Sequence, residues 1–343
     1  MFKFDPKKIL QHWEYILIFA VFIFLLIVFY NLFFTPNYYS AKEPVQFDIK
    51  RGEAFSSVAE RLFEKGIIPN ETNFRIAAFI YGAEKKVRAA RFHIPNGLSY
   101  LDLLDFFISG KCLFERAITV SDGQTIKWLA YKLERDIFTD SSKFVNNAFD
   151  TAFISTLGLN LNSLEGYLFA KDYVVYEHSP AEELLTIFYK SLNEFFVDSL
   201  EVRARQIGFT RHEILTLASI IKGETNLETE MPVISGVYHN RLRIGMRLQA
   251  DPTIQYILPK GWRRLLYKDL QIDSPYNTYK YSGLPPGPIN NPGAKAILAA
   301  LYPEDNKYLY FVADGKGGHK FGKTLKEHNQ NVRDFRNRFK RRK

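Results

Sequence analysis

One acidic residue, Glu224, lies where its chemistry would differ from that of a carboxylate in water. It follows Ile214, Leu217 and Ile221 at steps of three and four residues, the spacing that places side chains on one face of a helix. Loss of hydration on an apolar face favours the neutral form of a carboxyl group and raises its pKa. An acid with a raised pKa can give a proton to a leaving group near neutral pH. The spacing therefore indicates a general acid at this position.

A second interpretation is that the helix ends just before Glu224. Gly223 is a typical helix terminator, and a carboxylate beyond the end of a helix would point to water. The start of the same helix is better defined, because Thr210 and Glu213 match the Ser/Thr-x-x-Glu pattern of a capping box. From the residues alone, both interpretations of Glu224 stay open.

The segments after this helix carry amide, hydroxyl, aromatic and charged side chains on stretches rich in glycine and proline. Such groups suit a polyhydroxylated ligand, and binding residues often lie on loops that a rigid scaffold positions. We expect the loop 237–256 to line the cleft, and Pro252 to stiffen it and to disfavour helix at Asp251. The predicted substrate-binding residues are Asn240, Arg241, Gln249, Asp251, Asn277 and Tyr279, together with Glu165 and Tyr173 from an earlier aromatic run.

Motifs for several other chemistries are missing from the sequence. It has no HExxH pair for zinc, no GxSxG elbow for a serine hydrolase, and neither a P-loop nor a GxGxxG turn for nucleotides. The histidines are scattered, and a single cysteine, Cys112, excludes an internal disulfide and a multi-cysteine zinc site. We therefore expect neither a metal nor a cofactor.

The first segment of the chain predicts a membrane anchor. Residues 15–34 carry no charge, and about 20 apolar residues span a bilayer. Lysines precede this run and few follow it, so the positive-inside rule places residues 1–14 in the cytoplasm and the chain after residue 35 outside it. A cleaved signal peptide is the alternative, but its apolar core would be shorter. We expect a single-pass membrane protein whose N-terminus is cytoplasmic and whose folded part lies outside the cytoplasm.

The composition limits the possible partners. A formal net charge of +9 permits binding to nucleic acid, anionic lipid or an acidic polymer. Because the folded part is expected outside the cytoplasm, nucleic acid is a poor partner for it. The aromatic share of 15% fits a carbohydrate cleft as well as a large core, and we favour the core.

A pattern of a β-like run, a glycine turn and an amphipathic helix occurs three times after a linker at 35–46. The three copies begin at Phe47, Phe92 and Ile118, and their glycines suit a turn with positive φ. Apolar residues follow each glycine at steps of three, three and four, which fits one helix face. Such units resemble LysM wall-binding modules, although a plain α+β scaffold shows the same pattern. The sequence therefore predicts the α+β fold class.

Four long segments resemble the endolytic murein transglycosylase family, also called MltG or YceG-like: LASIIKGET, NRLRIGMRLQADPTIQY, SPYNTYKYSGLPPGPINNPG and LYFVADGKGGHKF. The resemblance covers nearly the whole chain. It implies a transmembrane helix at 15–34 in the bacterial cytoplasmic (inner) membrane, a LysM-like region at 47–135 and a periplasmic or otherwise extracytoplasmic catalytic domain at 136–343. In this family the Glu before the Thr of the Glu-Thr pair is catalytic, and here that residue is Glu224. The resemblance therefore selects the general-acid interpretation.

The resemblance also implies the reaction. Members of the family cut, without water, the β-1,4 bond between N-acetylmuramic acid and N-acetylglucosamine in peptidoglycan strands, and they leave 1,6-anhydro ends. They work beside peptidoglycan synthases, which are therefore expected partners. One carboxyl group can serve first as acid and then as base, whereas most glycoside hydrolases use two carboxylates.

The chain departs from the family pattern at two places. Lys222 and Gly223 stand where Glu-Lys is usual, and the glycine would loosen the helix beside the acid. Ala170 and Lys171 change the aromatic run, which affects the expected shape of the cleft. Two alternatives stay open: a hydrolytic muramidase that uses Asp251 as a second carboxylate, and a membrane-tethered wall-binding protein without catalysis. The chemical nature of the product end separates all three.

Overall fold

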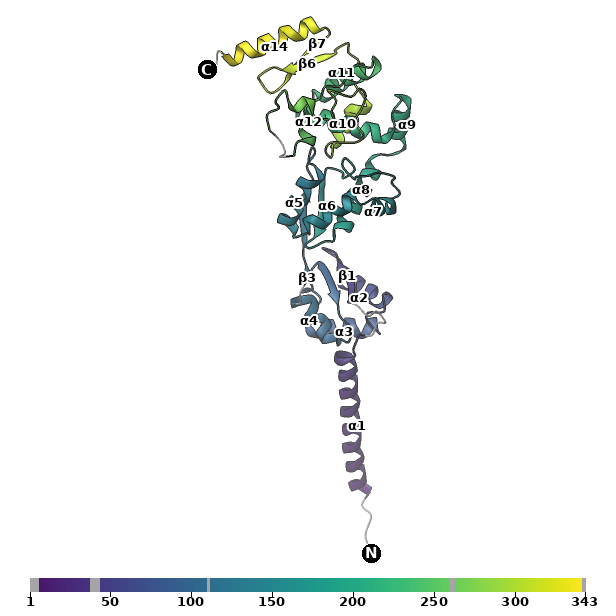
Figure 1. The fold of residues 1–343 in the computed structure, drawn as a ribbon. Helices are drawn as coiled ribbons and strands as arrows, with labels where there is room; N and C mark the ends of the chain where they lie inside the picture. The colour runs from purple at the N-terminus through teal and green to yellow at the C-terminus, as the bar shows by residue number, and fades with distance from the viewer. Residues whose placement is uncertain (1–5, 38–43, 110–111, 260–262, 341–343) are drawn as a thin grey trace. The chain divides into compact units, whose positions relative to one another are not determined.

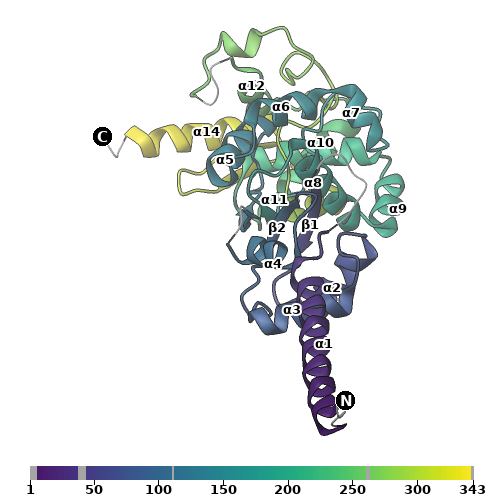
Figure 2. The ribbon, with the colours of Figure 1, turned by 90° about the horizontal axis from the view of Figure 1, so that it is seen from below.

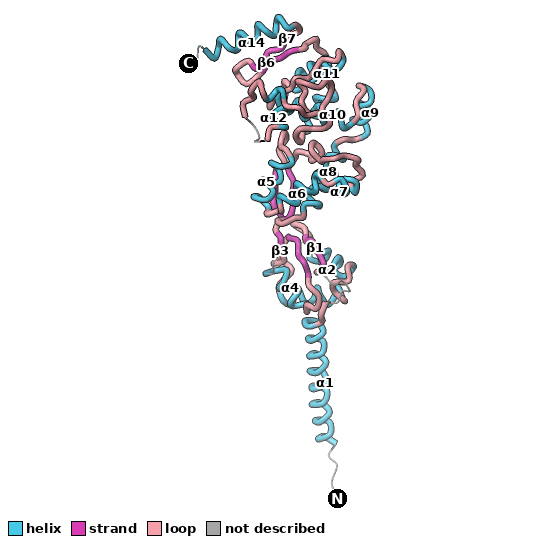
Figure 3. Tube along the Cα trace, viewed as in Figure 1, coloured by secondary structure: helices cyan, strands magenta, loops and turns pink. Residues whose placement is uncertain are grey.

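The computed structural model describes residues 6–37, 44–109, 112–259 and 263–340. The structure combines many helices with short strands in small separate sheets, which confirms the predicted α+β class (Figure 3). The chain forms two compact units, Met1–Arg116 and Ala117–Lys343 (Figure 1). The boundary that we predicted between residues 135 and 136 falls inside the second unit, so the third copy of the repeated pattern, which begins at Ile118, belongs to that unit.

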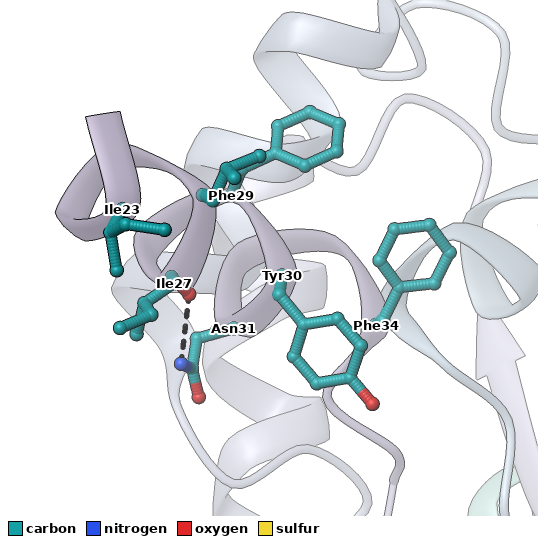
Figure 4. A pocket seen from close by; sticks show the side chains of 7 residues that line it. Ile23, Ile27, Phe29, Tyr30, Asn31 and Phe34 are labelled. Atoms are coloured by element: carbon teal, nitrogen blue, oxygen red, sulfur yellow. Dashed lines mark hydrogen bonds between the residues drawn. The ribbon is translucent and has the colours of Figure 1, made fainter. Parts of the chain in front are cut away.

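The first unit begins with α1 (Pro6–Phe34), which is the one helix of the described residues long and apolar enough to cross a membrane. Within its apolar part, Trp13–Phe34, an 18-residue window has a mean hydropathy of 2.9. The side-chain amide of Asn31 donates to the carbonyl oxygen of Ile27 at 2.9 Å, beside a hollow lined by apolar side chains (Figure 4). This bond within the helix gives the amide a partner, as an apolar surrounding requires.

A three-stranded antiparallel sheet and three helices form the body of the first unit. The strands, in sheet order, are β1 (Val45–Ile49), β2 (Ala90–Ile94) and β3 (Cys112–Leu113), and the helices are α2 (Phe55–Glu64), α3 (Glu71–Tyr81) and α4 (Tyr100–Ser109). The first two copies of the repeated pattern are β1–α2 and β2–α4. Their strands pair with Phe47 opposite Phe92, and both rings are buried in one core with Phe74 and Phe107.

The end of α1 packs directly onto this body. Phe33 is 5% exposed and belongs to the core of the unit, where α1 contacts α3 and α4. Asn37 is fully buried, and its backbone and side-chain N–H groups donate to carbonyl oxygens of the segment 95–98 at 2.5 and 3.1 Å. Part of the linker predicted at 35–46 is therefore packed against the unit, while its residues 38–43 lie outside the described residues.

The third copy, β4 (Glu115–Thr119) and α5 (Ile126–Ile137), leads into the second unit. β4 pairs with β5 (Asp172–Tyr176), and the helices α6 (Ser141–Phe149), α7 (Thr151–Thr156), α8 (Ala181–Phe195) and α9 (Asp198–Gln206) lie before and after β5 in the chain. The helices α5, α6 and α8 bury Leu129, Phe144 and Phe188 in a common core. The apolar helix face predicted for the third copy therefore packs into the core of the second unit.

The rest of the second unit is built around α10 (Arg211–Glu224). Besides α9, the helices that pack against it are α11 (Met231–Arg243), α12 (Asp251–Ile257) and α13 (Ala294–Leu301). Every residue from Ile214 to Ile221 is buried, so α10 is an interior helix. The 3-10 helix η1 (Asp269–Gln271), the hairpin of β6 (Tyr310–Ala313) and β7 (His319–Gly322), and α14 (Leu325–Lys340) complete the unit. α14 extends away from the other helices (Figure 2).

Candidate active site

Glu224 is the last residue of α10, which begins at the predicted capping box. The backbone N–H of Glu213 donates to the Thr210 hydroxyl at 3.2 Å, and the Thr210 N–H donates to the Glu213 carboxylate at 2.8 Å. The helix continues through Gly223, and Thr225 is its C-terminal cap. The interpretation that the helix ends before Glu224 is therefore wrong.

The carboxyl group of Glu224 is half-buried and accepts a hydrogen bond. The hydroxyl of Tyr238, on α11, donates to Glu224 Oε1 at 2.6 Å. Burial raises the pKa of Glu224 to about 7, although the bond from Tyr238 opposes this shift. The negative charge of Asp251 also raises the pKa, and the positive charge of Arg241 lowers it. A carboxyl group with such a pKa is populated in both protonation states at neutral pH, so it can give a proton and take one back.

Asp251 and Tyr279 form a second hydrogen-bonded pair whose charges interact with Glu224. The Tyr279 hydroxyl donates to Asp251 Oδ1 at 2.5 Å, and Asp251 is exposed at the first residue of α12. The prediction that Pro252 disfavours helix at Asp251 is wrong, because proline in a first helical turn has no N–H to leave unpaired. Much of the loop expected at 237–256 therefore belongs to α11 and α12.

Gly223 allows α12 to lie close to the end of α10. A Cβ atom at Gly223 would lie 2.5 Å from the Cβ of Pro252, well inside van der Waals contact. A larger residue would therefore push away the first turn of α12, which carries Asp251. The departure from the family pattern at Gly223 has a packing reason, and α10 remains helical there.

Lys222, the other departure, joins the end of α10 to the third copy of the repeated pattern. Its Nζ lies 3.0 Å from Asp122 Oδ2 and donates to Asn226 Oδ1 at 2.9 Å, and its side chain is only 9% exposed. The turn glycine of this copy, Gly123, packs against the same side chain, because a Cβ there would meet Lys222 Cε at 3.2 Å. The third copy therefore contacts the helical turn that carries Glu224.

Three of the predicted substrate-binding residues donate hydrogen bonds to the protein's own backbone. Arg241 is 6% exposed and donates to two backbone carbonyl oxygens at 2.5 and 2.7 Å. Asn240 donates to two carbonyl oxygens before β6 at 2.9 and 3.0 Å. Asn277 is fully buried and donates to two carbonyl oxygens near η1 at 2.7 and 3.0 Å. These bonds hold the protein's own backbone, and Arg241 acts on Glu224 through its charge.

Glu165 and Tyr173 lie in the interior of the second unit, and Gln249 lies on its surface. Glu165 accepts from the first N–H of α5 at 3.0 Å and from Asn291 Nδ2 at 3.2 Å, and burial raises its pKa to about 8. The Tyr173 hydroxyl donates to a backbone carbonyl oxygen at 2.7 Å. Gln249 has a left-handed backbone, with φ of 47°. Within the described part of the chain none of the three is hydrogen-bonded to Glu224, so their role in substrate binding stays a prediction.

Four predicted residues interact at one place, namely Glu224, Arg241, Asp251 and Tyr279. The structure adds Tyr238, which sequence reasoning missed. A signal for it existed, because Tyr238 shares the buried face of α11 with Ile234 and Arg241, and a hydroxyl on such a face needs a partner. Among the described residues, no group of three or more His, Cys, Asp or Glu side chains could hold a metal ion.

Comparisons with known proteins identify the family to which the chain belongs. The sequence model of the YceG-like family matches residues 47–334. A Bacillus subtilis (strain 168) protein named endolytic murein transglycosylase is 33% identical over 305 residues, and the match covers 84% of each chain. A protein of the same name from Streptococcus pneumoniae (strain D39) is 28% identical over 334 residues, which cover 87% of this chain and 59% of that protein. A crystal structure of a YceG-like protein from Listeria monocytogenes aligns with a TM-score of 0.59 at 29% identity, over 84% of this chain and 99% of that one. The chain belongs to the YceG-like family.

Proposed function

We propose that this protein is an endolytic murein transglycosylase that cuts the β-1,4 bond between N-acetylmuramic acid and N-acetylglucosamine in peptidoglycan and leaves 1,6-anhydro ends. The observation that carries the proposal is the half-buried carboxyl group of Glu224, because its pKa of about 7 makes both protonation states accessible. The names of the relatives from Bacillus and Streptococcus support the same reaction class.

One carboxyl group suffices for this reaction. Glu224 gives its proton to the glycosidic oxygen, and the bond between that oxygen and C1 of the muramic acid breaks. The resulting carboxylate takes the proton of the C6 hydroxyl of the same sugar while the C6 oxygen forms a bond to C1. The anhydro ring is closed, Glu224 is protonated again, and no water is consumed.

The hydrolytic alternative rests on Asp251, whose charge acts on Glu224. A hydrolase needs a second carboxylate that is free to attack the sugar or to activate water, about 5–5.5 Å from the acid in retaining enzymes and about 6.5–9.5 Å in inverting ones. Asp251 already accepts the Tyr279 hydroxyl at 2.5 Å, which favours a role in orienting groups. Mass spectrometry of the released muropeptides separates the two reactions, because an anhydro end is lighter than a reducing end by one water.

The same proposal places the reaction at the membrane. The apolar helix α1 anchors the chain in the cytoplasmic membrane with its N-terminus inside, so the rest of the chain meets peptidoglycan outside. The LysM-like region positions the glycan, and peptidoglycan synthases are the expected protein partners. A reporter that is active only outside the cytoplasm should function when fused after residue 343, and activity confined to a cytoplasmic reporter would reject this topology.

The substitution Glu224→Gln tests the proposed function. The amide keeps the size of the carboxyl group but can neither give nor take a proton. General acid–base catalysis by one group contributes roughly 10²–10⁴-fold, and here one group performs both transfers, so the loss of rate should reach the upper end of that range. Binding to isolated peptidoglycan should persist. The measurement is the rate at which full-length protein in detergent releases anhydro-muropeptides.

Glu228→Gln is the matched control. Glu228 is exposed, four residues after Glu224, and pairs with Lys295 at 3.4 Å. This variant should cleave at nearly the wild-type rate. The proposal fails if Glu224→Gln keeps more than about a tenth of the wild-type rate, or if Glu228→Gln is the inactive variant.

A further inference from the structure

Tyr238 is held so that its hydroxyl meets the carboxyl group of Glu224. The side chain has no exposed surface, and its ring packs edge-on against Phe311 of β6, with the ring centroids 5.9 Å apart. Its O–H donates to Glu224 Oε1 at 2.6 Å. When Glu224 is ionised, this bond is charge-assisted, and such bonds are shorter and stronger than those between neutral groups.

The other charged and titratable groups that interact electrostatically with Glu224 form their hydrogen bonds with other atoms. Arg241, on the next turn of α11, donates to backbone carbonyl oxygens. Tyr279, from the segment after η1, donates to Asp251 at the start of α12. Burial and the charge of Glu224 hold the pKa of Tyr238 well above its usual value, so its hydroxyl stays protonated. Within the described residues, the direct donor to Glu224 is therefore Tyr238.

We propose that Tyr238 is a positioning residue that holds Oε1 of Glu224 and leaves Oε2 to exchange the proton with the glycan. This inference rests on the proposed function, in which one carboxyl group is first acid and then base. Holding one oxygen keeps the other in the same place for both proton transfers. The hydroxyl also stabilises the ionised form of Glu224, which lowers its pKa against the effect of burial. The ionised form of Glu224 is therefore more populated than burial alone would allow.

Tyr238→Phe removes the hydroxyl and keeps the ring that packs against Phe311. Without the donor, the pKa of Glu224 rises. Because the free enzyme must start with Glu224 protonated, the high-pH limb of the kcat/KM profile should move to higher pH, by about one unit for the loss of one hydrogen bond to a charged group. Below this limb kcat should fall by roughly tenfold, with little change in KM, because the carboxyl group loses its fixed orientation.

Tyr167→Phe is the control for losing a buried tyrosine hydroxyl. Tyr167 is 3% exposed, and its hydroxyl lies 2.8 Å from His212 Nδ1 at the opposite end of α10. This variant should unfold at a lower temperature and keep the high-pH limb at the wild-type position. If Tyr238→Phe loses activity without moving the limb, the hydroxyl does not set the protonation of Glu224 and the proposal is overturned.

A second change at the same position covers the case in which the Phe variant does not fold. Incorporation of 3-fluorotyrosine at position 238 keeps the ring and the hydroxyl, and fluorine makes the hydroxyl a stronger donor. The high-pH limb should then move to lower pH, and an unmoved limb would contradict the proposal. Both shifts of the high-pH limb report on the protonation of Glu224, whichever product the enzyme forms. Reducing ends in the products of the wild-type protein would refute the proposed function but not the role of Tyr238.

Discussion

The first and third copies of the strand–turn–helix pattern share a sequence signature but differ in what their turns contact. In the first copy, a Cβ at Gly52 would meet no heavy atom within 4 Å, and Glu53 pairs with an arginine of the same copy at 2.5 Å. In the third copy, Gly123 packs against Lys222 of α10, and Asp122 pairs with that lysine at 3.0 Å. The pattern therefore predicts a local fold, while the partner of the turn decides whether a copy contacts the helix that carries Glu224.

A buried asparagine joins the third copy to the rest of the second unit. The N–H of Gly123 donates to the Asn291 carbonyl oxygen at 2.8 Å, and the Asn291 N–H donates to that of Gln124 at 2.9 Å. The Asn291 side-chain oxygen accepts from the N–H groups of Gly166 and Leu168 at 2.9 and 3.1 Å. The third copy is thus a structural part of the second unit, so the glycan positioning proposed for residues 47–135 can be tested separately on the first two copies.

Removing the copies in two steps should have the largest effect. A chain that lacks residues 45–113 and keeps α1 should still produce anhydro ends, because the second unit retains its own core, while its binding to isolated peptidoglycan weakens. Extending the deletion to residue 135 removes α5 and should prevent the second unit from folding. Thermal unfolding and muropeptide release measure both outcomes. If the chain with the longer deletion cleaves at the full rate, the third copy is not needed for the second unit to fold, and it does not differ from the first two copies in this respect.

Neutralising the acidic residue in the turn of the first or third copy, Glu53 or Asp122, should have an intermediate effect on cleavage. Asp122→Asn and Glu53→Gln should each reduce stability by more than the roughly 0.2–1 kcal/mol of an exposed ion pair, because the side chains of Lys222 and Glu53 are only 9% and 11% exposed. Cleavage should fall several-fold for Asp122→Asn only, because this substitution releases Lys222 at the end of the helix that carries Glu224. The comparison uses initial rates on a soluble glycan and chemical unfolding. Equal rates for the two variants would show that the ion pair does not position the acid.

Substituting the turn glycines should have the smallest effect on cleavage. Gly52 and Gly123 have φ of 77° and 82°, so alanine at either position should cost about 1–2 kcal/mol of stability. Gly123→Ala additionally displaces the Lys222 side chain and should lower the cleavage rate about twofold, since that flexible chain can move aside. Gly52→Ala should leave the rate unchanged. A lower rate for Gly52→Ala would assign the first copy a part in catalysis.

Local sequence signals predicted much of this architecture. The capping box at Thr210, the apolar span at 15–34 and the helical face that carries Glu224 each depend on residues within a few turns of one another. The close approach at Gly223 and the bond from Tyr238 depend instead on where α10, α11 and α12 cross. A single sequence contains no distance between helices, so neither contact could be derived from it.

Residue types in the sequence also do not identify the hydrogen-bond partners of polar side chains. Asn240 and Asn277 carry the amides that a sugar would bind, yet their amide groups donate to backbone carbonyl oxygens. Glu165 has the chemistry of a catalytic acid, yet it accepts from the start of α5 and from Asn291. Buried polar groups need partners whether or not a ligand is near, and spacing does not show which partner they find.

The contact between Asn291 and Gln124 also bears on when each unit can fold during synthesis. The two residues that this hydrogen bond joins are 167 positions apart in the sequence. Contacts over such separations form late, because the intervening chain must first be available and its loop must close. Domains fold as units from the N-terminus during synthesis, so the first unit can be complete while the second still waits for Asn291. We therefore expect Glu224 to acquire its buried surroundings only when most of the chain has been synthesised, which leaves the nascent protein without a working acid.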